Sequence, residues 1–216
     1  MASQVIYGKQ PVAEAERGRR RVLRAWRAPE TSGEELERLC GSPDHQGVVA
    51  EVEPYPYAGA SELLQVEGAL LIALDQVQDP RNLGAVARSA EVAGAAGLVI
   101  PERRAAEVTA VACKSSAGAV EHLPIAHVRN LADWLAEAKE AGFWIWGADG
   151  DAEQAPWEVD LTGPTVLVLG GEGKGLRPRV AAGCDGLIAL PQAGKVSSLN
   201  VSAAATALLF EAVRQR

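Results

Sequence analysis

From residue 69 onward, short apolar runs alternate with stretches of helical periodicity, and this alternation limits the fold more than any other feature of the sequence. The apolar runs are ALLIALD (69–75), LVIP (98–101), HLPIAHV (122–128), FWIWGA (143–148), TVLVLG (165–170) and GLIALP (186–191). Short apolar runs of this kind, bounded by turn residues, are typical of buried strands. Strands that alternate with helices predict an α/β domain built on a parallel sheet.

The segments between these runs are predicted to be helices. LGAVARSAEVAGAAG (83–97) has helical periodicity, with Gly97 as its stop, and NLADWLAEAKEAG (130–142) has Asn130 as N-cap and Gly142 as C-cap. Further helices are expected within 107–119 and 176–184, and a long final helix over 199–216.

The first 60 residues differ in character, which predicts a separate small module. They hold a basic run from Arg17 to Arg27, an acidic stretch, and the sequence EVEPYPYAGAS, in which Pro54, Pro56 and Gly59 mark a linker. We therefore expect a module over 1–58 and a main domain over 69–216. Basic runs are usually a solvated helix face, and we interpret Arg17–Arg27 in this way.

Charge and cysteine content exclude several classes of protein. The net charge is −7, so nucleic-acid binding would need a local basic patch, for which Arg17–Arg27, Arg81, Arg103 and Arg104 are candidates. No apolar run is long enough to cross a membrane, and the N-terminal residues contain no apolar signal core. Three widely spaced cysteines argue against a disulfide framework and favour the cytoplasm. The three histidines lack metal-ligand spacing, so no metal is expected.

Three polar segments follow predicted strands, and ligands bind at the carboxyl ends of strands in open α/β sheets. The first (74–89) carries Asn82, Gly84 and Arg88, where Gly84 would allow close approach of another backbone. Asn82 could equally be an ordinary residue near a helix start, and Arg88 an exposed side chain.

The second segment, LVLGGEGKGLRP (167–178), is rich in glycine directly after a strand. It matches neither the P-loop, because Lys174 is followed by Gly175, nor the dinucleotide fingerprint. Glu172 within this turn would repel a phosphate, which favours a cationic or hydrogen-donating ligand.

The third segment, LPQAGKVSSLNVSAAATALLFEAV (190–213), has two serines and Asn200 at the start of the final helix. Each alone would be a helix cap, but together they exceed what capping requires.

These three segments together resemble the motifs of the SpoU-type RNA 2′-O-methyltransferases of the SPOUT superfamily. The matching residues are NLGAVAR (82–88), LGGEGKGL (169–176) and the long third segment (190–213). YGKQPVAEA (7–15) resembles the start of the substrate-binding domain in members that methylate a guanosine ribose of 23S ribosomal RNA, although the module is shortened here. The resemblance implies a parallel α/β sheet with a C-terminal trefoil knot, preceded by a small α+β module. It also implies a homodimer.

The resemblance implies S-adenosylmethionine as cofactor. By motif position, the cofactor-binding residues would be Leu169, Gly170, Gly171, Leu190, Gln192, Ser198 and Leu199.

The catalytic residues that it implies are Asn82, Arg88, Glu172, Ser198 and Asn200. A guanidinium stays protonated in proteins, so we expect Arg88 to stabilise the developing alkoxide and to orient an RNA phosphate. Asn82 and Glu172 would hold Arg88 and its loop, while Ser198 and Asn200 would fix the third motif and the ribose.

Three alternatives stay open. The first is a transfer RNA substrate, and the second is a knotted dimer that binds RNA without methylating it. The third is a nucleotide-binding α/β enzyme, which the mismatch with phosphate-loop patterns disfavours.

Overall fold

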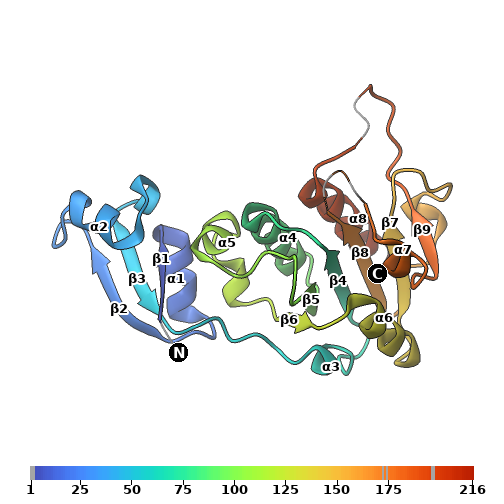
Figure 1. The fold of residues 1–216 in the computed structure, drawn as a ribbon, viewed down its shortest axis with the longest axis horizontal. Coiled ribbons are helices and arrows are strands. Elements are labelled where there is room, and N and C mark those ends of the chain that lie inside the picture. The colour runs from blue at the N-terminus through green and yellow to red at the C-terminus, as the bar shows by residue number, and fades with distance from the viewer. Residues whose placement is uncertain (1–2, 172, 174, 196–197) are drawn as a thin grey trace. The chain divides into compact units, whose positions relative to one another are not determined.

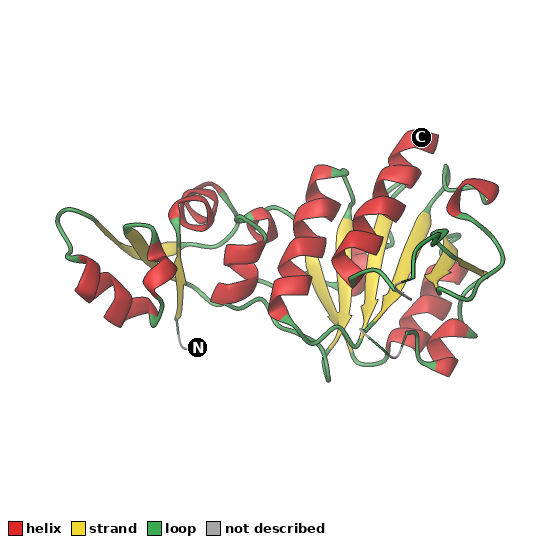
Figure 2. Ribbon diagram, turned by 90° about the horizontal axis from the view of Figure 1, so that it is seen from above, coloured by secondary structure: helices red, strands yellow, loops and turns green. Residues whose placement is uncertain are grey.

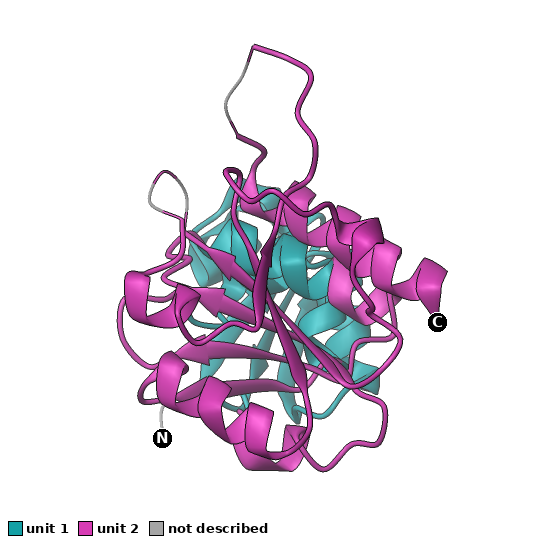
Figure 3. Cartoon of the chain, turned by 90° about the vertical axis from the view of Figure 1, so that its right-hand side faces the viewer, with its two compact units in different colours: residues 1–56, 80–88, 107–122 teal, residues 57–79, 89–106, 123–216 magenta. Residues whose placement is uncertain are grey.

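A computed structural model of the chain describes residues 3–171, 173, 175–195 and 198–216. Its elements divide into two compact units, shown in different colours in Figure 3. Unit 1 comprises residues 1–56, 80–88 and 107–122, and unit 2 comprises residues 57–79, 89–106 and 123–216.

Unit 2 is built on a six-stranded, wholly parallel sheet, as the alternating pattern predicts (Figure 1). The strand order is β6-β5-β4-β8-β7-β9. The strands are β4 (Leu70–Asp75), β5 (Gly97–Pro101), β6 (Ile125–Val128), β7 (Trp144–Ala148), β8 (Thr165–Gly170) and β9 (Gly186–Ile188). Every residue of β4 is buried, because this central strand is covered on both faces.

Helices cover both faces of this sheet. On one face, the buried residues Leu131, Trp134 and Leu135 of α6 (Leu131–Glu140) pack on alternate sheet residues, including Leu71 and Val166. On the other face lies α8 (Val201–Gln215), as Figure 2 shows, with a buried stripe at Val201, Ala205, Leu208, Leu209 and Ala212. The shorter helices of unit 2 are α3 (Ala60–Leu63), η3 (Pro156–Glu158) and α7 (Pro178–Ala181).

The structure confirms some of the predicted helix ends and contradicts others. Asn130 caps α6 by accepting a hydrogen bond from the Ala132 amide at 3.1 Å, which confirms its predicted role. The predicted C-cap of α6 is one residue too late, since Ala141 is the C-cap and Gly142 follows it with φ +89°. The predicted stop of the preceding helix at Gly97 is wrong, since α4 (Pro80–Val92) ends earlier and Gly94 follows with φ +71°. Gly97 instead begins β5, where a Cβ atom would lie 2.8 Å from the Leu63 side chain.

Unit 1 contains a three-stranded antiparallel sheet in the order β1-β3-β2. Its strands are β1 (Gln4–Tyr7), β2 (Val22–Arg27) and β3 (Val48–Val52), and its helices are α1 (Lys9–Arg17), α2 (Gly33–Cys40), η1 (Pro43–His45), α5 (Ala110–Ser115), η2 (Ala119–Glu121) and the start of α4. β3 lies in the middle and supplies buried valines to the core.

The interpretation of Arg17–Arg27 as a solvated helix face is wrong. Helix α1 ends at Arg17, and Val22–Arg27 form the edge strand β2. Arg20 is buried, whereas Arg17, Arg21, Arg24 and Arg27 are exposed. The helical interpretation failed because strand pairing with β3 and a distant partner of Arg20 override local preference.

Candidate active site

Three neighbouring strands of the sheet in unit 2 end beside a cavity of about 670 Å³. The strands are β8, β7 and β9, whose parallel alignment brings their carboxyl ends to one edge. The described residues that line the cavity are Ala148, Asp149, Gly150, Asp151, Leu169, Gly170, Gly171, Gly173, Gly175, Leu176, Ile188, Leu190, Gln192, Ser198, Leu199, Asn200, Val201, Ala204 and Leu208. The second and third sequence segments therefore meet at one site.

Gly170, the last residue of β8, and Gly171 after it lie too close to other backbone atoms to carry a side chain. Gly171 and Gly175 form an antiparallel bridge. A Cβ atom at Gly170 would lie 2.1 Å from the carbonyl carbon of Gly175, and one at Gly171 would lie 2.6 Å from the Gln76 carbonyl oxygen. The cavity wall here is therefore backbone, with Leu169 buried beneath it. Glu172, which the sequence marks as a catalytic candidate, lies outside the described residues.

A buried carboxylate fixes the far end of this loop. Asp75, the last residue of β4, is fully buried and accepts hydrogen bonds from the Arg177 backbone amide at 2.8 Å and the Arg177 Nε at 2.7 Å. Asp75 thus fastens the segment that returns from Gly175 to the central strand of the sheet.

The third segment supplies Leu190 and Gln192 after β9, and Ser198, Leu199 and Asn200 before α8. Asn200 is the N-cap of α8, because its Oδ1 accepts hydrogen bonds from the Ser202 amide at 2.9 Å and the Ser202 hydroxyl at 2.6 Å. Since Asn200 also lines the cavity, capping and ligand contact are compatible at this position.

The loop Ala148–Asp151 after β7 also lines the cavity, and sequence analysis missed it. The Asp151 amide donates to Asp149 Oδ1 at 2.9 Å, which makes a tight turn. The signal was present in the sequence, because Asp-Gly-Asp directly follows a predicted parallel strand. Of the described residues around the cavity, Asp149 and Asp151 are the charged ones.

The first segment lies on α4. Asn82 is buried and Arg88 is exposed, both within unit 1, whereas the cavity residues belong to unit 2. The expectation that Gly84 allows close approach is confirmed, because a Cβ atom there would lie 1.9 Å from the Ser115 hydroxyl and 2.5 Å from the Ala112 carbonyl oxygen. The next residue after Arg88, Ser89, shares a 2.6 Å hydrogen bond with Thr206 of α8.

In the described part of the chain, the acidic, histidine and cysteine side chains include no group of three that could hold a metal ion. No helix in the described ranges is long and apolar enough to cross a membrane.

Comparison with known proteins identifies the family to which these motifs belong. Residues 69–210 match the SpoU rRNA Methylase family. The chain belongs to the SpoU family. Residues 27–58 match a second family, described as RNA 2′-O ribose methyltransferase substrate binding. These matches confirm the resemblance inferred from the motifs.

The similarity to individual relatives supports the same family assignment. The 23S rRNA (guanosine-2′-O-)-methyltransferase RlmB of Pseudomonas putida is 48% identical over 80% of this chain and 71% of its own length. YacO of Bacillus subtilis is 40% identical over 98% of this chain and 95% of its own length. The chain spans 60% of the length of a mycobacterial tRNA/rRNA methyltransferase relative.

A solved structure with a similar fold is the SpoU methyltransferase AviRb of Streptomyces viridochromogenes in complex with AdoMet. It has a TM-score of 0.85 and 28% identity, over 99% of this chain and 90% of its own. The protein is an RNA 2′-O-methyltransferase of the SpoU family, and its cofactor is S-adenosylmethionine.

The cavity fits this cofactor. Its volume lies within the roughly 300–1,000 Å³ of small-molecule sites. S-adenosylmethionine carries a positive sulfonium and an ammonium group, and the carboxylates of Asp149 and Asp151 attract both charges. The backbone wall at Leu169–Gly171 offers amide and carbonyl groups at close range.

Proposed function

We propose that this protein methylates the ribose 2′-hydroxyl of a guanosine in 23S ribosomal RNA. The observation that carries the proposal is that the second and third SpoU motifs line one cavity at the carboxyl ends of β8, β7 and β9. The 48% identity to a 23S rRNA guanosine methyltransferase supports the ribosomal target. Transfer RNA is the second candidate substrate, supported by relatives named as tRNA/rRNA methyltransferases.

In this proposal the chain has two functional parts. Residues 1–58 form the RNA-binding module, supported by the substrate-binding family match at 27–58. Residues 69–216 form the catalytic domain, supported by the SpoU match at 69–210. The segments after β8 and β9 would form the trefoil knot of the SPOUT fold, with the cavity among them.

Seven residues are proposed to hold the cofactor. They are Leu169, Gly170, Gly171, Leu190, Gln192, Ser198 and Leu199, supported by their place around the cavity. Asp149 and Asp151 add negative charge on the same wall. When bound, S-adenosylmethionine supplies an electrophilic methyl group.

Arg88 is proposed to act on the RNA. As a cationic side chain with a planar fork of donors, it stabilises negative charge on the ribose oxygen and orients the adjacent phosphate. Its exposure leaves it available to a large substrate. Asn82 would fix the start of α4, Ser198 and Asn200 would position the ribose, and Glu172 would hold the glycine loop. Alignment of the reacting groups then supplies much of the rate enhancement.

The protein is further proposed to act as a homodimer in the cytoplasm. Trp157 of η3 is 57% exposed, and Phe210 and Val213 of α8 are 46% and 41% exposed. Phe210 and Val213 are three residues apart on one side of α8, which packs against η3. Light scattering on Phe210→Ser should give monomers where the wild type gives dimers. A monomeric wild type would reject the dimer.

The reaction itself is tested with labelled S-adenosylmethionine and unmodified 23S ribosomal RNA or transfer RNA. After digestion, 2′-O-methylguanosine from 23S RNA is the expected product. Label in transfer RNA alone would move the assignment to the second substrate.

Cofactor binding without any methylated product would instead favour an RNA-binding role. Arg88→Ala is the negative control, and Arg179→Ala, which changes an exposed arginine of α7 that pairs with Asp133 outside residues 1–58, is the matched surface control.

A further inference from the structure

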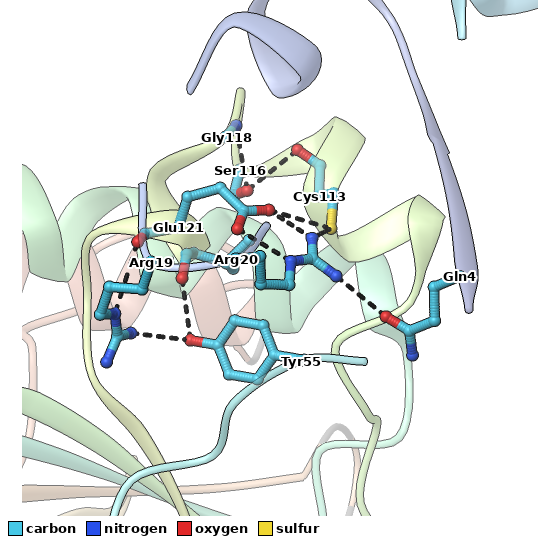
Figure 4. Close-up of polar contacts among 9 residues, drawn as sticks. Gln4, Arg19, Arg20, Tyr55, Cys113, Ser116, Gly118 and Glu121 are labelled. Carbon is cyan, nitrogen blue, oxygen red and sulfur yellow. Dashed lines mark hydrogen bonds and ion pairs between the residues drawn. The ribbon is translucent and has the colours of Figure 1, made fainter. Parts of the chain in front are cut away.

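A charged pair lies buried in unit 1, far from the cofactor cavity in sequence. The side chains of Arg20 and Glu121 are 1% and 0% exposed. Arg20 Nε donates to Glu121 Oε2 at 2.9 Å, and its Nη2 donates to Glu121 Oε1 (Figure 4). The pairing is a two-point contact between a planar guanidinium and a carboxylate, which is the strongest geometry for such pairs.

The rest of the guanidinium is also occupied. Arg20 Nη1 donates to Gln4 Oε1 at 2.9 Å, and Nη2 lies 3.1 Å from Cys113 Sγ (Figure 4). We call Gln4, Arg20, Cys113 and Glu121 the Arg20 cluster. Burial is the largest influence and lowers the pKa of Arg20, but the hydrogen bonds and charges of Glu121 and Cys113 together outweigh it, so the pKa is raised. Arg20 therefore keeps its positive charge inside the cluster.

The cluster joins two parts of the chain that are distant in sequence. Gln4 and Arg20 belong to the N-terminal sheet and its connections, while Cys113 and Glu121 lie on α5 and η2. Around it, Tyr55 donates from its hydroxyl to the Val120 carbonyl oxygen at 2.8 Å, and Arg19 Nη2 donates to the Tyr55 hydroxyl at 3.2 Å.

Two glycines show how tightly these parts are packed. A Cβ atom at Gly18 would lie 2.6 Å from the Cβ of Glu121, and one at Gly118 would lie 2.6 Å from the Cβ of Glu14. His122 Nε2 also lies 2.9 Å from Glu14 Oε2. The N-terminal sheet is thus docked on the segment 107–122 rather than merely tethered to it.

The same segment supports the start of α4 on its other side. The Ser115 hydroxyl donates to the Pro80 carbonyl oxygen at 3.4 Å, and the close approach at Gly84 involves Ala112 and Ser115. A continuous path of packed groups therefore runs from Arg20 through Glu121 and α5 to the helix that carries Asn82 and Arg88.

We propose that Arg20 and Glu121 are positioning residues that dock the N-terminal module on 107–122 and so hold captured RNA at a fixed place relative to Arg88. This inference rests on the proposed function. In this inference the Arg20–Glu121 pair affects the rate of methyl transfer, whereas the exposed face of the module binds the RNA.

The test uses three variants of the full chain: Arg20→Met, Glu121→Leu and the double substitution. Each single change leaves one charge buried without its partner, which opens the docked surface, whereas two apolar side chains of similar volume can restore packing. Each single variant should lower kcat for RNA methylation by about 10²-fold, the loss expected when reacting groups are displaced by roughly 1 Å.

In the single variants, KM for RNA and Kd for S-adenosylmethionine should stay near wild-type values, because the RNA face and the cavity are untouched. The double variant should recover most of kcat. Single variants with unchanged kcat would overturn the proposal. A double variant whose kcat is as low as that of the single variants would also overturn it. The two charges themselves would then be needed for the reaction, rather than the packing of the module on 107–122.

A measurement on the wild type keeps the test independent of variant folding and of the reaction. Alkylation followed by peptide mass spectrometry gives the rate at which each cysteine is modified. Docking predicts that Cys113 is modified only as fast as the whole protein unfolds, a rate given by hydrogen exchange of the buried strand β4, while the half-buried Cys40 and Cys184 react first.

Fast alkylation of Cys113 while the amides of β4 stay protected from exchange would show free undocking and overturn the proposal. If the wild type methylates no RNA, the proposed function fails, while slow alkylation of Cys113 would still establish docking.

Discussion

The carboxylate of Asp75 accepts hydrogen bonds from both the backbone amide and the side chain of Arg177, 102 positions later in the chain. Asp75 ends β4, and Arg177 follows the glycine-rich loop that lines the cavity proposed to hold the cofactor. Because Asp75 is fully buried and Arg177 half-exposed, the pair connects the core of the sheet to the edge of the site.

Asp75→Asn should therefore weaken both folding and cofactor binding. The amide keeps one acceptor but loses the charge that holds the guanidinium. We expect a loss of about 1–3 kcal/mol in the free energy of unfolding. Isothermal titration should show reduced affinity for S-adenosylmethionine, since the loop wall is less well fixed.

Asp133→Asn is the matched control, because Asp133 pairs with Arg179 at 2.6 Å on an exposed surface. Exposed pairs contribute about 0–1 kcal/mol, so this variant should resemble the wild type. Equal effects of the two substitutions would contradict the role given to burial of Asp75.

The strands of unit 2 could be predicted from sequence because they are buried and parallel. β4 and β8 are continuous apolar runs, and this signal is local. Asn130 and Gly84 were also interpreted correctly, since a helix cap and a close approach depend on one residue type.

Other features depend on contacts that sequence spacing cannot reveal. Arg20 is buried because Glu121, 101 positions away, accepts its hydrogen bonds. Asp-Gly-Asp after a predicted strand marks a polar turn at residues 149–151, but this turn lines the cavity because β7 lies between β8 and β9, an order that periodicity does not give.

Arg88→Ala should abolish methyl transfer while leaving cofactor affinity nearly unchanged. The exposed guanidinium belongs to α4, whereas the cavity walls come from β7, β8, β9 and the start of α8. Removal of one preorganised charge-stabilising group typically costs about 10²–10³ in kcat. Single-turnover kinetics and calorimetry measure the two effects separately. Parallel loss of transfer and cofactor affinity would reject the role of Arg88 on the RNA.

Gly84→Ala should destabilise the start of α4, because the added methyl group meets the Ser115 hydroxyl at 1.9 Å and backbone at 2.5 Å. Overpacking of this kind costs about 1–3 kcal/mol, measurable by urea denaturation. Gly163→Ala is the control, since a Cβ atom there has open space and φ is not positive. A stable Gly84→Ala protein would show that α5 can move away from α4.

RNA binding should depend steeply on salt despite the net charge of −7. Exposed arginines on and beside β2 supply local positive charge, and Arg24 lies 4.9 Å above the Trp26 ring, a pair suited to a phosphate and a base. Affinity should fall strongly between about 50 and 200 mM salt.

Arg24→Ala should reduce the slope of log K against log salt by about 0.7–0.9, the value for one phosphate contact. Arg179→Ala, which changes an exposed arginine outside residues 1–58, should leave the slope unchanged. Affinity that is flat with salt, or equal slopes for wild type and Arg24→Ala, would place the RNA elsewhere.

Alkaline pH should destabilise the protein through Cys113. Burial raises the pKa of this thiol from 9.0 to about 11, and the nearby Arg20 charge offsets only part of the rise. Below pH 9 the thiol is protonated in both states, so its contribution is complete. Between pH 9 and 11 the unfolded chain loses the proton and the folded chain keeps it, so the free energy of unfolding falls, by up to about 2–3 kcal/mol.

Urea denaturation at pH 8 to 11 measures this loss, and Cys113→Ser should flatten the curve relative to wild type because serine does not titrate there. Cys40→Ser, which alters a half-buried cysteine outside the Arg20 cluster, should leave the slope unchanged. Lysines and tyrosines also titrate in this range, but they do so in every variant, so the difference between variants isolates the thiol. Parallel curves for wild type and Cys113→Ser would mean that Cys113 ionises as easily in the folded protein as in the unfolded chain, and would contradict its burial beneath Arg20.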